Sequence, residues 1–218
     1  MKVTVITSCT AKKAVTHPRQ LTMADFARGT SHIVQRERDL AEVAMAAEDL
    51  YVGEQHRRLM QGVCALRRAG GDVSVWIVSA GYGVIPGSRR ICPYEASFEE
   101  LGTRQAQAWA THLGVGDALA ALLRQPADLG LVLLGSRYAR AARFDRVQEL
   151  SYPVVAFAGK EGAQLFPPGF DLYPIAQEDT RRFGVNMIGL KGMLAGSILA
   201  NLPLYQPDRF PAQSKSIN

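Results

Sequence analysis

The segment Trp76–Phe98 reads WIVSAGYGVIPGSRRICPYEASF. Its start belongs to the run Val73–Ser79, which is apolar enough on both faces to predict a central strand of a parallel sheet. Glycines, prolines, tyrosines, arginines and a single acid follow directly. Because ligands of open α/β sheets bind in the crevice outside the carboxyl ends of the strands, we expect this loop to carry function.

Apolar runs and helical spacing extend this pattern over most of the chain. Further strands are predicted at residues 3–8, 129–136 and 152–159, and in the segment FDLYPI that begins at Phe170. Helices are predicted at residues 36–51, 54–68, 98–112 and 116–124, from Arg137, and from about residue 190. Strands that alternate with helices predict a three-layer α/β fold, with a mostly parallel central sheet of four to five strands and helices on both faces.

Length and composition are those of an ordinary globular protein. The chain has 218 residues, of which 47% are hydrophobic and 21% charged, and no shift in composition requires a second domain. We therefore expect a single α/β domain over residues 1–205 and a polar C-terminal tail over residues 206–218. No apolar run approaches the length of a bilayer span, and the N-terminus lacks the order of a signal peptide, so a cytoplasmic protein is expected.

Net charge and cysteine content limit which partners and cofactors are expected. A formal net charge of +5 favours an anionic partner, such as nucleic acid or a phosphorylated small molecule. The three cysteines are widely spaced and form no C-x-x-C pair, so we expect neither a metal nor another cofactor. Neither feature predicts an oligomeric state.

The turn after the first strand, TSCTAKK, is small, polar and basic. Ser8, Cys9 and Thr10 offer hydroxyl, thiol and backbone N–H groups, and Lys12 and Lys13 add positive charge. Such a turn suits an anion or the edge of a nucleobase. The alternative is a solvated basic loop. Spacing excludes a nucleoside-triphosphate P-loop.

The turn after the strand Val73–Ser79 is rich in glycine. Gly81 and Gly83 permit close approach of the backbone to a ligand, and Tyr82 between them offers a flat surface on which a base can stack. Ser79 adds a hydroxyl group at the end of the strand. The alternative is a tight turn in which Tyr82 covers the edge of the sheet.

Glu95 follows Tyr94 and is the one carboxylate between Asp72 and Glu99. An acid held against apolar groups beside a ligand can act as a general base toward water, or stabilise the oxocarbenium cation that forms as a glycosidic bond breaks. The alternatives are ion pairing with Arg89 or Arg90, and a favourable interaction with the dipole of the helix that follows.

The helix predicted after the third strand carries four arginines at three-residue spacing: Arg137, Arg140, Arg143 and Arg146. A row of arginines along one helix face is a candidate contact for a phosphate backbone, as are Lys13, Arg89 and Arg90. The alternative is a solvated face. Gly135, in the turn before this helix, and Tyr138, near its start, are candidates for substrate binding.

Several of these segments together resemble a little-characterised bacterial and phage family within the uracil-DNA-glycosylase-like α/β group. TSCTAKK from Thr7 is similar to its small-Cys-Ser/Thr-x-K-K turn, and DLYVGEQH from Asp49 to its L-Y-x-G helix end. SAGYGVIP from Ser79 matches S-A-x-Y-G-[LV]-[IV], and PYEASF from Pro93 matches P-Y-[DE]. LLGSRYAR, which contains Tyr138, resembles its L-x-G-x-x-Y turn. The resemblance covers roughly the first two thirds of the chain.

This resemblance implies a uracil-DNA-glycosylase-like fold, nucleobase recognition and cleavage of an N-glycosidic bond. Related domains occur in archaeal enzymes that exchange or modify 7-deazaguanine bases in tRNA. The chain departs from the group in having Gly81 where the family often has lysine, and in lacking the G-Q-D-P-Y and H-P-S motifs of the uracil-removing enzymes. A modified base, rather than uracil, is therefore the expected substrate.

We thus expect a DNA glycosylase that releases a modified base, such as those that phages carry, and leaves an abasic site, with a role in anti-phage defence. The base would be flipped into the crevice, Tyr82 or Tyr94 would stack, and Glu95 would position water or stabilise the sugar cation. A lysine Schiff base through Lys160 or Lys191 is a less favoured variant.

Two other functions remain open at this stage. One is a hydrolase or ribosyltransferase that acts on free nucleosides or nucleotides, and the other is a non-catalytic module that binds nucleic acid. The sequence does not choose the base, the strandedness of the nucleic acid, or DNA over RNA.

Overall fold

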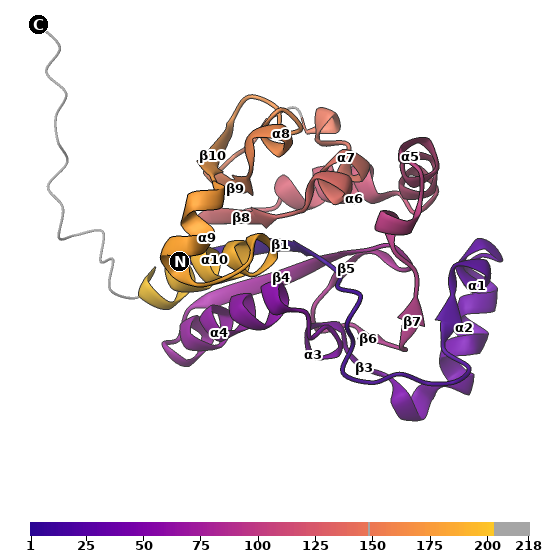
Figure 1. The fold of residues 1–218 in the computed structure, drawn as a ribbon. Helices are drawn as coiled ribbons and strands as arrows, with labels where there is room; N and C mark the ends of the chain where they lie inside the picture. Colours follow the sequence, from indigo (N-terminus) through magenta and orange to yellow (C-terminus); the bar gives the residue numbers. More distant parts are fainter. Residues whose placement is uncertain (148, 203–218) are drawn as a thin grey trace, which may run out of the picture.

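In the part of the chain that the structure describes, six strands form the central sheet, in the order β10-β9-β8-β1-β4-β5 (Figure 1). They are β1 (Lys2–Ser8), β4 (Asp72–Ser79), β5 (Gly83–Pro86), β8 (Leu129–Leu133), β9 (Val154–Ala158) and β10 (Phe170–Pro174). Neighbouring strands are parallel except β4 and β5, which are antiparallel. The computed structural model describes residues 1–147 and 149–202, so the tail predicted over residues 206–218 lies outside the described residues.

The expected α/β class and mostly parallel sheet are confirmed, but the sheet has one strand more than the predicted four to five. The additional strand, β5, occupies part of the segment that was predicted to be a loop. Gly83 pairs with Ser79, and its φ of +72° lets the chain turn back along β4. Alternating burial then continues through Val84 and Ile85, so the apolar part of this loop forms a strand of the sheet.

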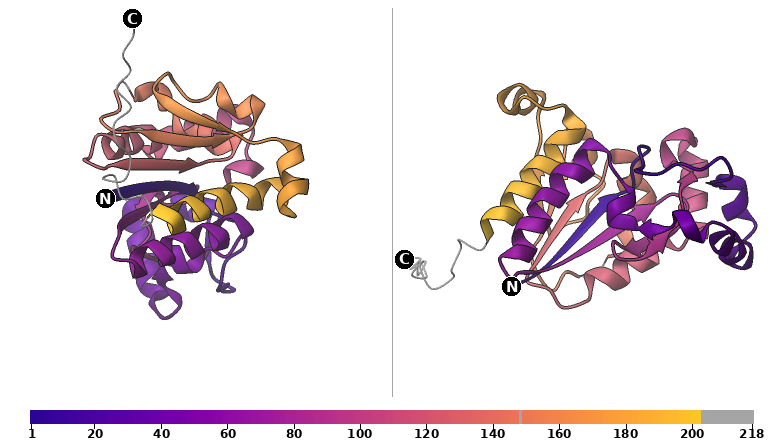
Figure 2. Two further views of the ribbon diagram at one scale, coloured as in Figure 1. Left: turned by 90° about the vertical axis from the view of Figure 1, so that its left-hand side faces the viewer. Right: turned by 90° about the horizontal axis from the view of Figure 1, so that it is seen from below.

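Helices cover both faces of the sheet, as expected. Helices α4 (Glu54–Arg68) and α10 (Met187–Asn201) lie side by side on one face, whereas α5 (Thr103–His112), α6 (Val115–Leu123) and α7 (Ser136–Ala142) lie on the other (Figure 2). Two short helices, α8 (Lys160–Ala163) and α9 (Gln177–Phe183), follow β9 and β10. Within the described residues, no single helix is long and apolar enough to cross a membrane, although α9 and α10 together, bent by 67°, reach that length.

The helix predicted at residues 36–51 is wrong. That segment contains the end of α2 (Thr30–Asp39), the 3-10 helix η1 (Ala41–Val43), the strand β3 (Met45–Ala46) and the short helix α3 (Ala47–Leu50). The cause is competition for backbone groups. β3 pairs with β6 (Arg90–Ile91), and the N–H groups of Ala47 and Glu48 donate to the carbonyls of Arg89 and Gly87. These tertiary bonds replace the helical ones.

The loop after β4 and β5 forms a small layer beyond the carboxyl end of the sheet. Its strand β7 (Tyr94–Glu95) pairs with β2 (Leu21–Thr22), which precedes α1 (Met23–Ala27). In Figure 1 this layer, with α1 and α2, stands apart from the helices that cover the sheet. Through β7, this loop therefore pairs with the N-terminal segment of the chain that contains β2.

The helix predicted at residues 98–112 is interrupted. The 3-10 helix η2 (Phe98–Glu100) comes first, and α5 begins only after Gly102. The Ser97 side chain accepts a hydrogen bond from the N–H of Glu99 and so caps η2 rather than a long helix. By contrast, the helix predicted at residues 54–68 is confirmed at both ends as α4.

Glycines allow α10 to lie directly on the backbone of α4. A Cβ atom at Gly192 would come within 2.1 Å of the carbonyl oxygen of Gln55, and one at Gly62 within 2.1 Å of that of Gly196. Backbone-to-backbone packing of this kind leaves little room for sliding or rotation. It therefore fixes the first turns of both helices, which reach the carboxyl edge of the sheet.

Candidate functional site

A cavity of about 1070 Å³ opens where β1, β8 and β9 end, between the first turns of α4 and α10. We call it the sheet-edge cavity. Its lining comes from the segments after these three strands and after β10, from η2, and from the starts of α4 and α10. The turns after the parallel strands were expected to converge, and three of the four do so, while the turn after β4 lies outside.

Six residues predicted to bind substrate line this cavity: Ser8, Cys9, Thr10, Lys12, Gly135 and Tyr138. The two lysines considered for a Schiff base, Lys160 and Lys191, line it as well. Seven of the eight lie at the end of β1 or within five residues after β1, β8 or β9, and Lys191 lies near the start of α10, which is why the strand-end rule found most of them.

The glycine-rich turn after β4 does not line the sheet-edge cavity. A Cβ atom at Gly81 would lie 2.5 Å from the ring of Phe26, so the close approach at this glycine is to a side chain of the protein. The Tyr82 ring packs edge-on against the rings of Phe26 and Tyr94, with centroids 5.0 and 5.4 Å apart. The packing of Tyr82 corresponds to the alternative in which this residue covers the edge of the sheet.

Tyr94 lies in a buried network of hydroxyl groups outside the lining of the cavity. Its side chain is 1% exposed, and its hydroxyl oxygen is 2.7 Å from both the Ser79 Oγ and the Tyr51 hydroxyl. The Ser79 Oγ also accepts the N–H groups of Gly81 and Tyr82, so its own proton goes to Tyr94. Burial raises the pKa of Tyr94 and Tyr51 well above the ordinary value, and both phenols therefore stay neutral. These hydrogen bonds hold the turn after β4 in a fixed conformation.

Glu95 is exposed and also lies outside the cavity lining. Its neighbour Lys13 places its ammonium 4.3 Å from the centre of the Tyr94 ring. Burial lowers the pKa of Lys13, while the nearby Cys9, Glu95 and Glu100 act in the opposite direction. Lys13 is thus a half-buried cation that packs against the Tyr94 ring.

The predicted row of arginines does not exist as one helix face. Helix α7 ends at Ala142, Arg143 adopts a left-handed conformation with φ of +51°, and Arg146 lies in the 3-10 helix η3 (Phe144–Arg146). Arg143 pairs with Asp145 at 2.9 Å, and Arg146 pairs with Asp117. The turn at Arg143 separates the four side chains that three-residue spacing suggested would align.

The two arginines of the loop after β5 also have protein partners. Arg89 lies 3.6 Å from a Glu37 carboxylate oxygen and covers the Tyr82 ring, and Arg90 donates to the Ala44 carbonyl. The sequence analysis considered an ion pair of Arg89 or Arg90 with Glu95. Both arginines do contact groups of the protein, but these groups belong to α2 and the segment after it rather than to Glu95.

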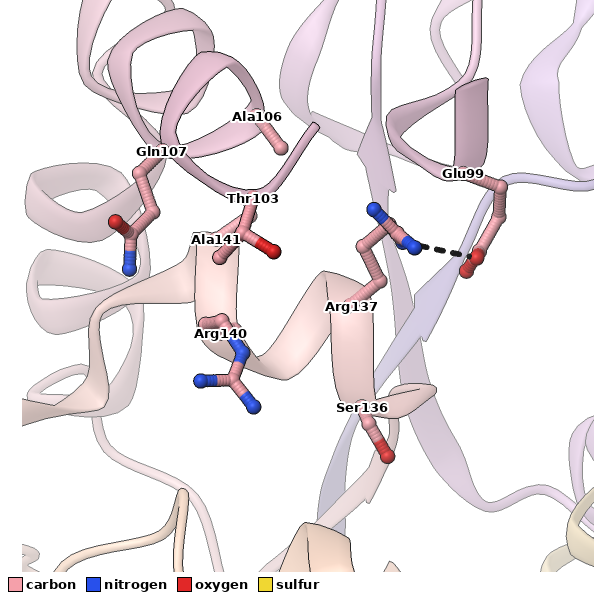
Figure 3. Close-up of a pocket in the computed structure, with 8 residues that line it drawn as sticks. All are labelled: Glu99, Thr103, Ala106, Gln107, Ser136, Arg137, Arg140 and Ala141. Atoms are coloured by element: carbon pink, nitrogen blue, oxygen red, sulfur yellow. Dashed lines mark ion pairs between the residues drawn. The ribbon is translucent and has the colours of Figure 1, made fainter. Parts of the chain in front are cut away.

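Arg137 and Arg140 line a second cavity of about 550 Å³ between α5 and α7, which we call the arginine groove (Figure 3). Arg137 reaches across to Glu99 at 3.2 Å, as Figure 3 shows. Arg140 is exposed, and within the described residues it makes no ion pair. Glu99 and Ser136 line both cavities, so the groove adjoins the sheet-edge cavity.

Gln55 is a lining residue that the sequence analysis missed. It is 7% exposed, and its Nε2 donates to the Thr7 Oγ1 at 3.1 Å and to the Leu133 carbonyl at 3.0 Å. A carbonyl only accepts, so the Leu133 contact fixes which end of the amide is nitrogen. The Gln55 Oε1 accepts no hydrogen bond from residues 1–147 or 149–202 and is the atom left for a ligand. The sequence contained one signal for Gln55: it is a polar residue one helical turn before the inward-facing Leu59.

Lys191 approaches the cavity from α10. Its Nζ donates to the Leu134 carbonyl at 2.8 Å, just beyond the end of β8. Burial lowers the pKa of this lysine to about 8. A partly buried amine with a reduced pKa in a cavity is a candidate for chemistry.

Four carboxylates line the sheet-edge cavity, and two of them are engaged. Glu54 accepts from Arg58 and Asn186, which lowers its pKa, and Glu99 pairs with Arg137. Glu100 and Glu161 make no ion pair within the part of the chain that the structure describes. In the same residues no three His, Cys, Asp or Glu side chains gather closely enough to hold a metal ion.

The fold and the site define an α/β protein with a mostly parallel sheet and a cavity at the carboxyl edge of its strands, lined by both apolar and polar groups. The chain belongs to a family of unknown function, DUF6884, whose model matches residues 35–162, more than half of its length. The match includes α4, β4, β8 and β9, and thus Gln55, Glu100 and Tyr138, but neither β1 nor α10. No curated protein matches the chain in sequence.

Proposed function

We propose that the sheet-edge cavity holds one nucleotide of a nucleic acid and that the protein cleaves its N-glycosidic bond, which releases a modified base and leaves an abasic site. The observation that carries this proposal is the locked amide of Gln55. Its Nε2 is committed to Thr7 and Leu133, so Oε1 is a fixed acceptor for a ligand. The edges of nucleobases present N–H donors of the matching kind.

The size and charge of the cavity support a nucleotide rather than a bare base. Its volume of about 1070 Å³ is at the upper end of ordinary ligand pockets and leaves room for a base, its sugar and a phosphate. Lys12, Lys160 and Lys191 supply cationic groups, and the first turns of α4 and α10 direct their positive dipole ends toward the same space. Cys9 and Tyr138, 3.1 Å apart, form part of its wall.

The resemblance of the motifs to the uracil-DNA-glycosylase-like group supports the same reaction and a modified base as its target. A bacterium with such an activity would damage the DNA of phages that carry that base. The phage connection rests on the resemblance, whereas the proposal of a nucleotide site also rests on Gln55.

For the chemical step we propose Glu100 in the role that the motif suggested for Glu95. As the glycosidic bond breaks, positive charge develops on the sugar, and a carboxylate beside it lowers the energy of that state or holds the attacking water. Glu100 lines the cavity without an ion-pair partner in the described residues, whereas Glu95 lies outside the lining. Hydrogen-bond donors of the wall would stabilise the departing base.

The arginine groove favours a polynucleotide over a free nucleoside. It shares Glu99 and Ser136 with the sheet-edge cavity, and Arg140 in its wall is exposed. A strand whose target nucleotide occupies the cavity would find a cationic path for the neighbouring phosphates there. A free nucleoside would not need this groove.

The test is a base-release assay with single- and double-stranded DNAs that carry normal bases, 5-hydroxymethylcytosine or 7-deazaguanine derivatives, read by mass spectrometry of the freed base and by alkali-sensitive strand breaks. We expect release from a modified DNA, its loss in Glu100→Gln, and its retention in Glu95→Gln. Loss in Glu95→Gln alone would restore the motif-based assignment. Turnover of free nucleosides without release from DNA would instead indicate a small-molecule hydrolase.

A further inference from the structure

The position of Lys191 suggests a second activity at the same site. We propose that the protein is also an abasic-site lyase, in which Lys191 condenses with the aldehyde of the abasic sugar and the strand is then cut on its 3′ side. The inference rests on the proposed function for its substrate class, a nucleic acid in the sheet-edge cavity. It does not depend on which base is removed.

Lys191 is held in place more firmly than the other lysines of the cavity. Its Nζ is fixed by the Leu134 carbonyl at 2.8 Å, and α10 is fixed by the glycine contacts with α4. The side chains of Lys12 and Lys160 are exposed, and their ammonium groups make no hydrogen bond within the described residues. An anchored amine at the wall can meet one atom of a bound sugar repeatedly, as a covalent mechanism requires.

The surroundings of Lys191 also keep its amine reactive. Within residues 1–147 and 149–202 no carboxylate pairs with it, and burial lowers its pKa to about 8. Near pH 8 about half of the molecules therefore carry the neutral amine. A lysine nucleophile needs that lone pair, and a desolvated pocket is the usual way to provide it.

The chemistry balances without an oxidant or a reductant. After base release, the open form of the abasic sugar carries an aldehyde at C1′. The Lys191 Nζ adds to C1′ and water leaves, which gives an imine. Loss of a proton from C2′ to solvent forms the C2′=C3′ double bond as the C3′–O bond breaks, and the phosphate departs on the 3′ fragment. Water then hydrolyses the imine and returns the lysine.

The experiment uses an oligonucleotide with a preformed abasic site, so that base recognition is not required. Sodium borohydride reduces the imine to a stable amine that joins the protein to the DNA, and peptide mass spectrometry locates the linkage. We expect an adduct on Lys191, strand cleavage without borohydride, and an increase in both between about pH 7 and about pH 8.

Variants separate Lys191 from its neighbours. Lys191→Arg keeps the charge but cannot form the imine, so trapping and cleavage should both disappear, while the variant still binds the oligonucleotide. Lys2→Met, at the opposite edge of the sheet, serves as the lysine-loss control and should behave as the wild type does.

Two results would overturn the inference: an adduct on Lys12 or Lys160 that persists in Lys191→Arg, or no adduct from a protein that binds the abasic oligonucleotide. The proposed glycosylase has a separate readout, because base release is measured on intact modified DNA. Trapping without base release would count against the glycosylase alone, and base release without trapping against the lyase alone.

Discussion

Gln55 is a polar residue at a helix position that points into the core, and its amide connects the fold to the proposed chemistry. The two hydrogens of Nε2 satisfy groups on β1 and β8, and the oxygen remains for a ligand. Both parts of this arrangement can be tested with side chains of nearly the same size.

Gln55→Glu should destabilise the protein. A carboxylate cannot donate to the Leu133 carbonyl, so that buried acceptor loses its partner, at a cost of about 1–3 kcal/mol in the free energy of unfolding. Urea denaturation measures this, with Gln61→Glu on the exposed side of the same helix as the control. Equal stability of the two variants would contradict the hydrogen bonding assigned to Gln55.

The stability of the protein should depend on pH through Lys191. Burial lowers the pKa of this lysine from 10.5 to about 8, so between these values the unfolded chain holds a proton that the folded protein has released. Stability due to this group therefore rises with pH across that window and is constant below it. Urea denaturation at about pH 7 and about pH 9.5 should show that the free energy of unfolding of the wild type increases with pH relative to that of Lys191→Met. A constant difference would contradict the shift.

For single residues, the position relative to the predicted strand ends was the feature of the sequence that indicated which side chains line the cavity. Ser8, Cys9 and Tyr138 line the cavity because they lie at or just after strand ends: β1 ends at Ser8 as predicted, and β8 ends at Leu133, three residues before the predicted end. Tyr82 and Glu95 do not line it, because a motif does not tell which way a loop folds, and Phe26, far away in sequence, occupies the space next to Gly81.

Among the elements, the pair α4 and α10 carries the site. Gly192→Ala would place a methyl group 2.1 Å from the Gln55 carbonyl oxygen, which is backbone and cannot move aside. We expect a loss of roughly 1–3 kcal/mol or more in stability and a weaker hold on Lys191. Thermal unfolding and borohydride trapping measure the two effects.

Gly189→Ala is the matched comparison within the same helix. There the nearest atoms belong to the Glu54 carboxyl group, the end of a flexible side chain that can shift. The cost should therefore be clearly smaller than for Gly192→Ala. Equal effects of the two substitutions would mean that α10 does not depend on backbone contact with α4.

The elements differed in how well their sequences predicted them. Helix α4 was predicted at both ends because its apolar face and the glycines after it agree with its tertiary environment. Residues 36–51 have similar helical spacing, but the backbone of residues 87–91 competes for their hydrogen-bonding groups. That competition involves a distant segment, and periodicity within one segment does not contain it.

For the molecule as a whole, the rule that parallel strands deliver their ends to one edge predicted the location of the cavity. It did not predict the contribution of α10, because the glycine contacts that bring Lys191 to this edge involve two helices more than a hundred residues apart. It also did not predict the arginine groove, which depends on where α7 ends.

The arginine groove provides a test of nucleic-acid binding. Arg140→Glu should weaken binding to DNA and reduce the slope of log affinity against log salt by about one. Arg68→Glu, at the opposite end of α4, makes the same change in charge away from both the groove and the sheet-edge cavity, and should have little effect. Equal effects of the two variants would show that only overall charge matters.

Whether the sheet-edge cavity recognises the base is tested by base release from modified DNA by the wild type and by Gln55→Leu, which removes the fixed acceptor. The variant also loses the donor to the Leu133 carbonyl, so urea denaturation is used to establish that it is folded under the assay conditions. We expect release by the wild type and a loss of about tenfold or more in the folded variant, corresponding to one hydrogen bond to the base. Binding of the DNA through the groove should persist. Release at an unchanged rate in Gln55→Leu would contradict the claim that the sheet-edge cavity recognises the base.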